Sequence, residues 1–571
     1  MENYHVWVSW SDLYAAAATY DDVVARLRPY GLEMVLATLG AISWRISMPS
    51  GDDVLKPQAD IVSLVFGDKA VQLDRDITAW RSRIADSEFG APPIVKVFHE
   101  LQVVTAAKIA LLAVPPADPA NGPSCLQAFG EAMLMVNDLI NLHTRSDELP
   151  QGIRERADLD RWVSHFVPNR LFHGGGNLQH AIARAHDLYL TDRPHLSGKP
   201  GYVNLPDLFE RLTGVPPDLA SVAMFGALAQ TKTDDPKVLL DTFLEPLNLS
   251  PDEERAVFAL FAEGADTLRE QLMIDGCGAD DLRVFDPLPF GKTPVVVHDG
   301  EAYCPSVAFL HRKMTRGLFF IFDDRFEDRK ASKAFRDYTG PVFEDHIDTL
   351  LRRVFPKESG RYIGPDFLDG PALAGSKKCD GVIVYEGSVV LIEAKATVLP
   401  LSVWTAGDVD ALSGKIDDIV GDSAEQFAGT IRLIEEGKLK EVGADPANIE
   451  HYLPLIVTLE TMPNDFMVYQ LVEQRMRQRV VLEDRKAKAV QWADVGDVES
   501  LETLLAGGSS LHDILMARLD DRSYREEPFG NWLMGHYEPR ALGTNPYLKK
   551  KFDEAFERAL EYLRSRRSSG G

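Results

Sequence analysis

The chain has 571 residues, of which 45% are hydrophobic and 26% are charged. These proportions are ordinary for a folded protein of several domains, so they exclude a largely disordered chain. The 61 Lys and Arg residues are outnumbered by 87 Asp and Glu residues, which gives a formal net charge of −26. This charge excludes a uniformly basic surface that coats nucleic acid, so any nucleic-acid partner must be bound by a local patch.

Helical apolar spacing dominates the first 290 residues. It predicts helices over residues 11–27 and 126–142, and a capping box that begins at Ser250 predicts the start of another helix. We divide this part of the chain into a helical N-terminal domain, residues 1–190, and an acidic, helical middle domain, residues 191–290.

A β-hairpin and a helix are expected to form a connector over residues 291–335. Residues 293–298 are rich in β-branched side chains and predict one strand, Asp299-Gly300 predicts a tight turn, and residues 301–304 predict the returning strand. A helix is expected around residues 309–318.

Residues 336–490 alternate between helical and strand patterns, which predicts an α/β core with a central mixed sheet flanked by helices. The expected elements are a helix over 341–354 with Pro341 in its first turn, strands at 381–385 and 389–394 joined by Glu386-Gly387, a helix over 408–436 and a strand at 452–460. Residues 491–571 are expected to be mixed and then helical, ending in a helix over 547–564. The predicted fold class is therefore multidomain, with a large helical N-terminal region, an α/β core and a helical C-terminal tail.

Three ionisable residues meet at one end of the second predicted hairpin. Asp380 precedes its first strand and Glu393 and Lys395 end its second, and these two ends lie side by side in an antiparallel pair. Glu393 and Lys395 share a face because they are two residues apart. Two carboxylates this close in an apolar setting need a compensating charge, which a hard cation such as Mg²⁺ supplies. The pattern predicts metal-assisted phosphodiester hydrolysis.

These residues resemble the D…ExK signature of the PD-(D/E)xK nuclease superfamily, which has the restriction-endonuclease-like fold. The resemblance covers about residues 335–465, less than a quarter of the chain. It implies that Asp380, Glu393 and the backbone carbonyl of Ala394 bind Mg²⁺, for which Mn²⁺ can substitute. Lys395 would serve the attacking water.

Two flanking residues also match features of this superfamily. Glu344 lies on the predicted helix before the sheet, and the resemblance implies that it holds a second metal ion or orders the first. Gln426 lies on the helix after the ExK strand, and the resemblance implies that it positions Lys395 or the phosphate. Cys379 stands where the signature often has proline, which is a common departure.

Basic residues near the motif are candidate contacts for nucleic acid, although a solvated surface is the alternative for each of them. The candidates are Lys377 and Lys378, shortly before Asp380, Arg352 and Arg353 at the end of the predicted helix of Glu344, and Arg361 after it.

The sequence thus favours a Mg²⁺-dependent endonuclease that acts on DNA rather than RNA. The resemblance implies products with a 5′-phosphate and a 3′-hydroxyl. A role in restriction or anti-phage defence is an expectation by analogy alone, with the helical N-terminal half as a sensing, assembly or partner-binding module and with homo-oligomers allowed. The alternative is a helical scaffold with a degenerate nuclease-like domain that binds nucleic acid or a protein partner without cutting.

Other features limit cofactors and location. Gly291-Lys292-Thr293 has Asp286 where a P-loop needs glycine, so no ATP site is expected. The four cysteines form no CxxC pair, and no secretory signal or apolar stretch near 18 residues is visible, so we expect a cytoplasmic protein without a membrane partner. The charge of −26 predicts weak, salt-sensitive binding to bare DNA.

Overall fold

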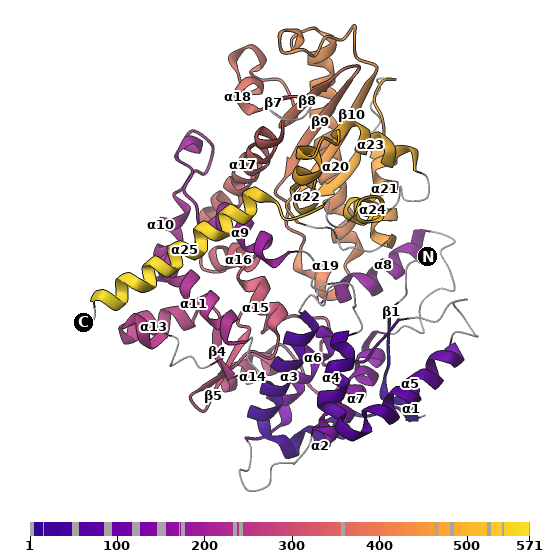
Figure 1. The fold of residues 1–571 in the computed structure, drawn as a ribbon, viewed down its shortest axis with the longest axis vertical. Coiled ribbons are helices and arrows are strands. Elements are labelled where there is room, and N and C mark those ends of the chain that lie inside the picture. The colour runs from indigo at the N-terminus through magenta and orange to yellow at the C-terminus, as the bar shows by residue number, and fades with distance from the viewer. Residues whose placement is uncertain are drawn as a thin grey trace.

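The fold is described from a computed structural model (Figure 1). It describes residues 5–14, 16–47, 56–84, 94–116, 126–144, 156–170, 172, 177–231, 237–238, 244–355, 360–460, 462, 466–479, 485–521, 527–538 and 542–569. The molecule is elongated, with the N-terminal helices at one end and the largest sheet at the other (Figure 1).

The N-terminal bundle is built around α6, Glu100–Ala113, which is buried from Glu100 to Leu111. A helix that is buried on all sides belongs at the centre of a bundle. Around it lie α1 (Trp10–Tyr14), α2 (Tyr20–Leu27), α3 (Gly31–Ser47), α4 (Lys56–Phe66), α5 (Ala70–Ile84), α7 (Gln127–Thr144) and the parallel strands β1 (His5–Trp7) and β2 (Ile94–Lys96).

The middle of the chain combines helices with a mixed four-stranded sheet. Its elements are α9 (Leu178–Tyr189), α10 (Leu205–Thr213), α11 (Pro217–Gln230), α13 (Pro251–Phe258), α14 (Ala265–Ile274), α15 (Val307–Lys313), α16 (Gly317–Asp323), β3 (Lys237–Val238), β4 (Ala262–Gly264), β5 (Val295–His298) and β6 (Glu301–Tyr303). The sheet order is β3-β6-β5-β4, and β5–β6 is the hairpin that the sequence predicts. The capping box at Ser250 is also confirmed, because its side chain accepts a hydrogen bond from the backbone of Glu253.

The C-terminal half contains a mixed five-stranded sheet in the order β11-β10-β9-β8-β7. β8–β9 is the second predicted hairpin, and β9, β10 and β11 run parallel to one another. The strands are β7 (Arg361–Ile363), β8 (Gly381–Tyr385), β9 (Ser388–Lys395), β10 (His451–Thr458) and β11 (Gln491–Asp494). The sheet therefore extends past residue 490, the limit expected for the α/β core.

Helices cover both faces of this sheet. α17 (Arg329–Val354) and α22 (Val495–Ala506) lie on one face, and α20 (Val409–Glu435) and α21 (Phe466–Arg479) lie on the other. Alternate strand residues divide between the two cores: Ile392 packs with the first pair of helices and Leu391 with the second. Because both faces of the sheet are covered, the two strands of the β8–β9 hairpin are almost wholly apolar before Glu393.

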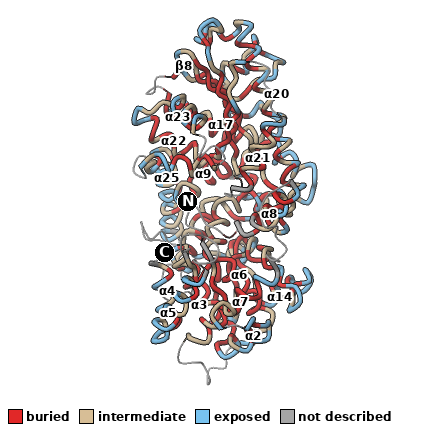
Figure 2. The backbone as a smooth tube through the Cα atoms, turned by 90° about the vertical axis from the view of Figure 1, so that its right-hand side faces the viewer, coloured by how far each residue is buried: buried red, intermediate tan, exposed pale blue. Residues whose placement is uncertain are grey.

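The two halves of the chain share packing contacts. α8 (Arg156–Arg170) packs against α19 (Leu401–Ala406), where the Ser164 hydroxyl donates to the carbonyl of Gly407 over 2.8 Å. α25 (Pro546–Ser569) runs back along α9 and α11 (Figure 1). Buried residues lie in the interior of both the upper and the lower half of the molecule, with exposed residues at the periphery (Figure 2). The remaining helices are α18 (Pro365–Leu368), α23 (Leu511–Asp520) and α24 (Phe529–His536).

Some element limits differ from those predicted. α17 begins at Arg329, so Pro341 lies inside the helix and not in its first turn. The single helix expected at 11–27 is divided into α1 and α2, and that at 309–318 into α15 and α16. Within the described residues no single helix is long and apolar enough to cross a membrane, and only the bent pair α10 and α11 meets that test jointly.

Candidate nuclease site

The β8–β9 register brings Asp380 beside the end of β9. Gly381 pairs with Ile392, and the backbone N–H of Asp380 donates to the Ile392 carbonyl over 3.0 Å. The Asp380 side chain turns back onto β9, where its Oδ2 accepts a hydrogen bond of 2.7 Å from the backbone N–H of Ala394. Asp380 is thus held against β9 by Ile392 and Ala394, the two residues on either side of Glu393.

Glu393 and Lys395 form an ion pair at the end of β9. The Lys395 Nζ lies 2.9 Å from Glu393 Oε1, and the Glu393 side chain is only 4% exposed. The other oxygen, Oε2, is buried and has no hydrogen-bond partner among the described residues. A buried carboxylate oxygen without a donor is costly, and a cation would satisfy it.

Glu344 lies on α17, which packs against β9 on the face of the sheet opposite α20. Burial raises the pKa of its carboxyl, while the charges of Lys199 and Lys395 oppose that shift. Glu344 in turn raises the pKa values of Asp380 and Glu393. The four predicted ionisable residues therefore belong to one electrostatic group.

The carboxyl groups of this site hold protons more tightly than exposed ones. Burial, followed by the charges of Glu393 and Glu344, raises the pKa of Asp380 well above its usual range. Burial raises the pKa of Glu393 to about 7, although its contact with Lys395 lowers it. Burial alone would lower the pKa of Lys395, but Glu393 and Asp380 outweigh it and the pKa is raised. Such clusters of shifted pKa values are common at functional sites.

α20, which covers the face of the sheet opposite α17, carries two polar residues near the site. Gln426, predicted from the sequence, has a buried Oε1 without a hydrogen-bond partner in the described part of the chain. Asp422, one turn earlier, raises the pKa values of both Glu393 and Lys395. Asp422 was not predicted from the sequence, although its spacing of four residues from Gln426 places both on one face of a helix.

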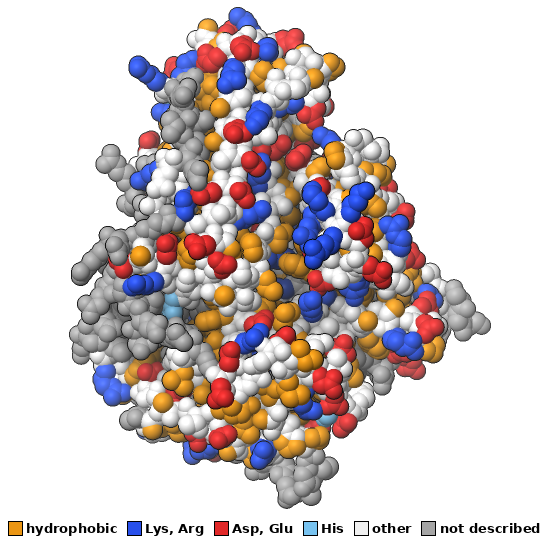
Figure 3. Space-filling view, turned by 180° about the vertical axis from the view of Figure 1, so that it is seen from behind, with side chains coloured by type: hydrophobic (Ala, Val, Ile, Leu, Met, Phe, Trp, Pro, Cys, Tyr) orange, Lys and Arg blue, Asp and Glu red, His pale blue; other side chains and the backbone are white. Residues whose placement is uncertain are grey.

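The predicted basic contacts lie in different places. Lys378 is near the site, with its Nζ 3.5 Å from Asp369, and Lys377 pairs with Glu425 on α20. Arg361 pairs with Val384 in β7–β8, towards the end of the sheet opposite Asp380. Arg352 pairs with Asp348 at 2.7 Å and Arg353 with Glu502 at 3.2 Å. From behind, Lys and Arg side chains gather on one side of the molecule at mid-height (Figure 3).

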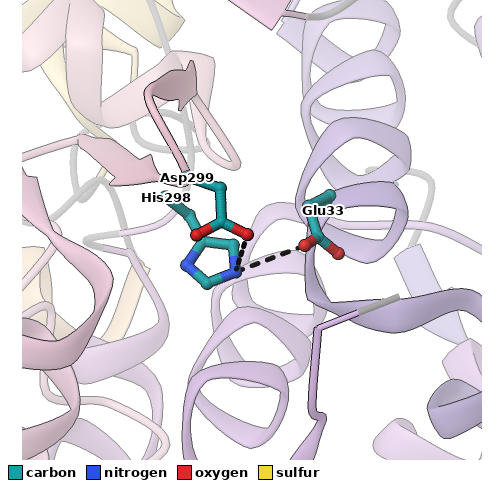
Figure 4. Close-up of side chains that lie close together, drawn as sticks. All are labelled: Glu33, His298 and Asp299. Carbon is teal, nitrogen blue, oxygen red and sulfur yellow. Dashed lines mark ion pairs between the residues drawn. The ribbon is translucent and has the colours of Figure 1, made fainter. Parts of the chain in front are cut away.

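A second group of side chains, outside the β8–β9 site, has the shortest mutual distances between potential metal-ligand atoms in the described residues. Glu33 on α3 and His298 and Asp299 on the β5–β6 hairpin have ligand atoms within 4.8 Å of one another, and no other trio of His, Cys, Asp or Glu in the described ranges does so. His298 Nε2 lies 3.3 Å from Glu33 and 3.8 Å from Asp299 (Figure 4). The carboxylates of Glu344, Asp380 and Glu393 are not drawn together to that extent.

Comparisons with known proteins add little to this geometry. No protein-family model matches the sequence, and no curated protein matches it. Among solved structures the chain is similar to the restriction endonuclease FokI, with 9% identity over 85% of this chain and 96% of that chain. The TM-score is 0.21, so this likeness carries no argument about fold or activity.

Proposed function

We propose that the chain is a metal-dependent nuclease with its site at the end of β8 and β9. The observation that carries this proposal is the group of Asp380, Glu393 and Lys395 on adjacent antiparallel strands, with a buried Glu393 oxygen that has no hydrogen-bond donor in the described residues. Burial raises the pKa values of Asp380 and Glu393, which means that their charged forms lack compensation. A divalent cation would supply that compensation and would also bind the unsatisfied Glu393 oxygen.

Mg²⁺ fits the donor set, which consists of oxygens only. Asp380, Glu393 and the carbonyl of Ala394 would hold it, and Glu344 would hold a second ion or order the first. When bound, the metal polarises a phosphoryl oxygen and lowers the pKa of a water ligand. Lys395 orients that water or stabilises the charge that develops, and Gln426 positions Lys395 or the phosphate. Mn²⁺ is expected to replace Mg²⁺.

The substrate we propose is DNA, cut internally to leave a 5′-phosphate and a 3′-hydroxyl. A role in restriction or anti-phage defence, with the N-terminal half as sensor, assembly or partner-binding module, is the biological setting that we favour by analogy. Homo-oligomers are compatible with this role.

A non-catalytic scaffold is the second candidate. Two observations favour it: Lys395 is engaged by Glu393 at 2.9 Å, and Glu344, Asp380 and Glu393 do not form a close ligand trio. Such a protein would bind nucleic acid or a protein partner through the same surface and leave phosphodiester bonds intact.

One comparison separates the two candidates. Supercoiled plasmid and single-stranded DNA are incubated with the wild type, Lys395→Ala and Lys440→Ala, each with Mg²⁺ or EDTA. Lys440 is a matched control, because it pairs with Asp445 at 2.9 Å in the segment before β10. β10 begins beside Ser388, at the end of β9 opposite Lys395. The nuclease predicts Mg²⁺-dependent cleavage that Lys395→Ala lowers about 100-fold or more and that Lys440→Ala leaves unchanged. Equal cleavage by the wild type and Lys395→Ala would rule out this site.

A further inference from the structure

We propose that Lys199, from the middle of the chain, and Lys378 form a clamp for a backbone phosphate of DNA at the rim of the nuclease site, and that Asp369 occupies this clamp when DNA is absent. The inference rests on the proposed nuclease function and adds to it a residue from outside the D…ExK core. Its evidence is the docking of residues 193–202, the ion pairs of Asp369 and the reach of Lys199 towards the acidic site.

Residues 193–202, here called the docking loop, are held against α17 close to Glu344. Arg193 Nε lies 2.9 Å and His195 Nε2 lies 2.7 Å from the two carboxylate oxygens of Asp345, the residue after Glu344. Arg193 is only 5% exposed and also pairs with Asp187 at 2.9 Å. This end of the docking loop is therefore fixed by the buried pair of Arg193 with Asp187 and by the contacts of Arg193 and the exposed His195 with Asp345.

The other end of the docking loop touches α17 further towards its N-terminus. Gly201 lies so close that a β-carbon there would be 2.6 Å from the carbonyl oxygen of Ala334, and the ring of Tyr202 meets Tyr338 edge-on at 5.7 Å. Between these anchors the backbone N–H of Lys199 donates to the Leu196 carbonyl over 2.8 Å. Lys199 thus lies in a loop that contacts α17 both before and after it in the sequence.

Lys199 and Lys378 share one carboxylate. The Lys199 Nζ lies 3.0 Å from Asp369 Oδ2, and the Lys378 Nζ lies 3.5 Å from Asp369 Oδ1. Asp369 directly follows α18, and Lys378 stands two residues before Asp380. Two ammonium groups on the two oxygens of one anion form the arrangement that a phosphate with two free oxygens also satisfies.

The shared carboxylate is exchangeable. Asp369 is 52% exposed and Lys199 is 39% exposed, so their contact is a surface ion pair with a small net stabilisation. A DNA phosphate carries the same charge as Asp369 and also releases counterions when lysines neutralise it. DNA can therefore displace Asp369 from Lys199 at the surface, and it meets Lys378, whose side chain is 16% exposed, at the inner edge of the clamp.

The clamp is within electrostatic reach of the proposed metal ligands. Among the charges that lower the pKa of Glu344, that of Lys199 has the largest effect, and the charges of Glu344 and Asp380 both act on Lys199. A phosphate held by Lys199 and Lys378 would accordingly lie beside the acidic group and not on a remote surface. The clamp positions the strand, while Asp380, Glu393 and Lys395 perform the reaction.

The test measures DNA binding separately from cleavage. All variants are made in the full chain that carries Lys395→Ala, and a fluorescein-labelled 30-base-pair duplex is titrated in EDTA at several KCl concentrations. Lys199→Ala is expected to weaken binding about tenfold and to make the slope of log K against log[salt] less negative by about 0.9. Asp369→Asn is expected to strengthen binding several-fold, because it removes the competing anion.

The pair Lys440 and Asp445 supplies the matched controls, since it is a similar Lys–Asp contact away from the site. Lys440→Ala and Asp445→Asn are expected to bind as the parent does. Weaker binding by Asp369→Asn would overturn the clamp and make Asp369 a structural bridge. Equal binding by Lys199→Ala and Lys440→Ala, or no binding by the parent, would also overturn it.

The clamp and the nuclease proposal can fail separately. Mg²⁺-dependent cleavage that needs Lys395, together with unaltered DNA binding by Lys199→Ala, would retain the nuclease and reject the clamp. Loss of binding in Lys199→Ala without any cleavage by the wild type would retain the clamp on a non-catalytic protein.

Discussion

At the scale of single residues, Gly201 permits the docking loop to lie against α17. Its φ of +76° is in the left-handed region, and a β-carbon would meet the Ala334 carbonyl oxygen at 2.6 Å. The first feature costs an L-residue about 1 kcal/mol. The second cannot be relieved by a side-chain rotation, because the neighbouring atom belongs to the helix backbone. The place of Lys199 therefore depends on a residue without a side chain.

Gly201→Ala is expected to lower the free energy of unfolding more than Gly437→Ala does. Gly437 is a matched control, because its φ is +74° and nothing lies within 4 Å of its β-carbon position. Both variants lose about 1 kcal/mol from the backbone conformation, and Gly201→Ala loses about 1–3 kcal/mol more from the contact. Urea denaturation measures the difference. Equal losses would mean that the close approach to α17 is absent.

The site residues predicted from strand pairing are joined by one local element, whereas Glu344 on α17 and Gln426 on α20 were predicted through the resemblance. Asp380, Glu393 and Lys395 belong to a single hairpin, so strand pairing and a period of two are enough to bring them together. Lys199 enters the same group from nearly two hundred residues away, through a loop whose docking depends on tertiary contacts. No spacing in the sequence predicts such an approach.

At the scale of elements, α17 shows what local patterns predict and what they miss. Pro341 favoured a helix start because proline is well tolerated in the first turn. The helix instead begins twelve residues earlier, where the side chain of Asp328 accepts hydrogen bonds from Lys330 and Ala331. Its first half is kept helical by burial of Phe335 and Tyr338, which the amino-acid pattern alone does not reveal.

α20 was predicted within one residue at each end, and it fixes the loop that leads into Asp380. The Thr430 hydroxyl accepts a hydrogen bond of 2.8 Å from the backbone N–H of Cys379. One residue earlier, a β-carbon on Gly429 would lie 2.1 Å from the carbonyl oxygen of Lys377. The helix and the loop before Asp380 are therefore in backbone contact at this glycine.

Gly429→Ala is expected to displace the loop before Asp380 and to lower Mg²⁺-dependent cleavage at least about tenfold, because small misplacements of reacting groups are costly. Gly421→Ala lies on the same helix with nothing within 4 Å of its β-carbon, and it is expected to leave cleavage unchanged and to stabilise the protein by up to about 1 kcal/mol. Cleavage rates and circular dichroism compare the two. Full activity in Gly429→Ala would contradict the close contact.

At the scale of the whole molecule, buried charges join elements that the sequence analysis assigned to three separate domains. His346 on α17 is fully buried between Asp187 on α9 and Glu499 on α22. Its Nδ1 lies 2.9 Å from Asp187 and its Nε2 lies 3.4 Å from Glu499. The predicted limits at residues 190 and 490 follow changes in sequence texture, whereas this network and the apolar cores cross them. Composition cannot reveal such pairings, because each partner alone looks like an ordinary polar residue.

His346→Gln is expected to lower the free energy of unfolding by about 1–3 kcal/mol at pH 6, because it removes the buried cation that Asp187 and Glu499 share. Asp187 then keeps its pair with Arg193, and Glu499 keeps its pair with Arg184. Burial lowers the pKa of His346, but its hydrogen bonds to Asp187 and Glu499 outweigh this and the pKa is raised above 6.5. A raised pKa stabilises the folded protein fully below the unfolded value and loses that contribution as pH rises through the folded value. The difference in free energy of unfolding between the wild type and His346→Gln should therefore narrow from pH 6 to pH 9.

Urea denaturation at both pH values measures this difference. The control is His512→Gln, because His512 is a partly exposed histidine that pairs with Asp513 at 2.9 Å. A difference that stays constant with pH would show that His346 is not charged in the folded protein.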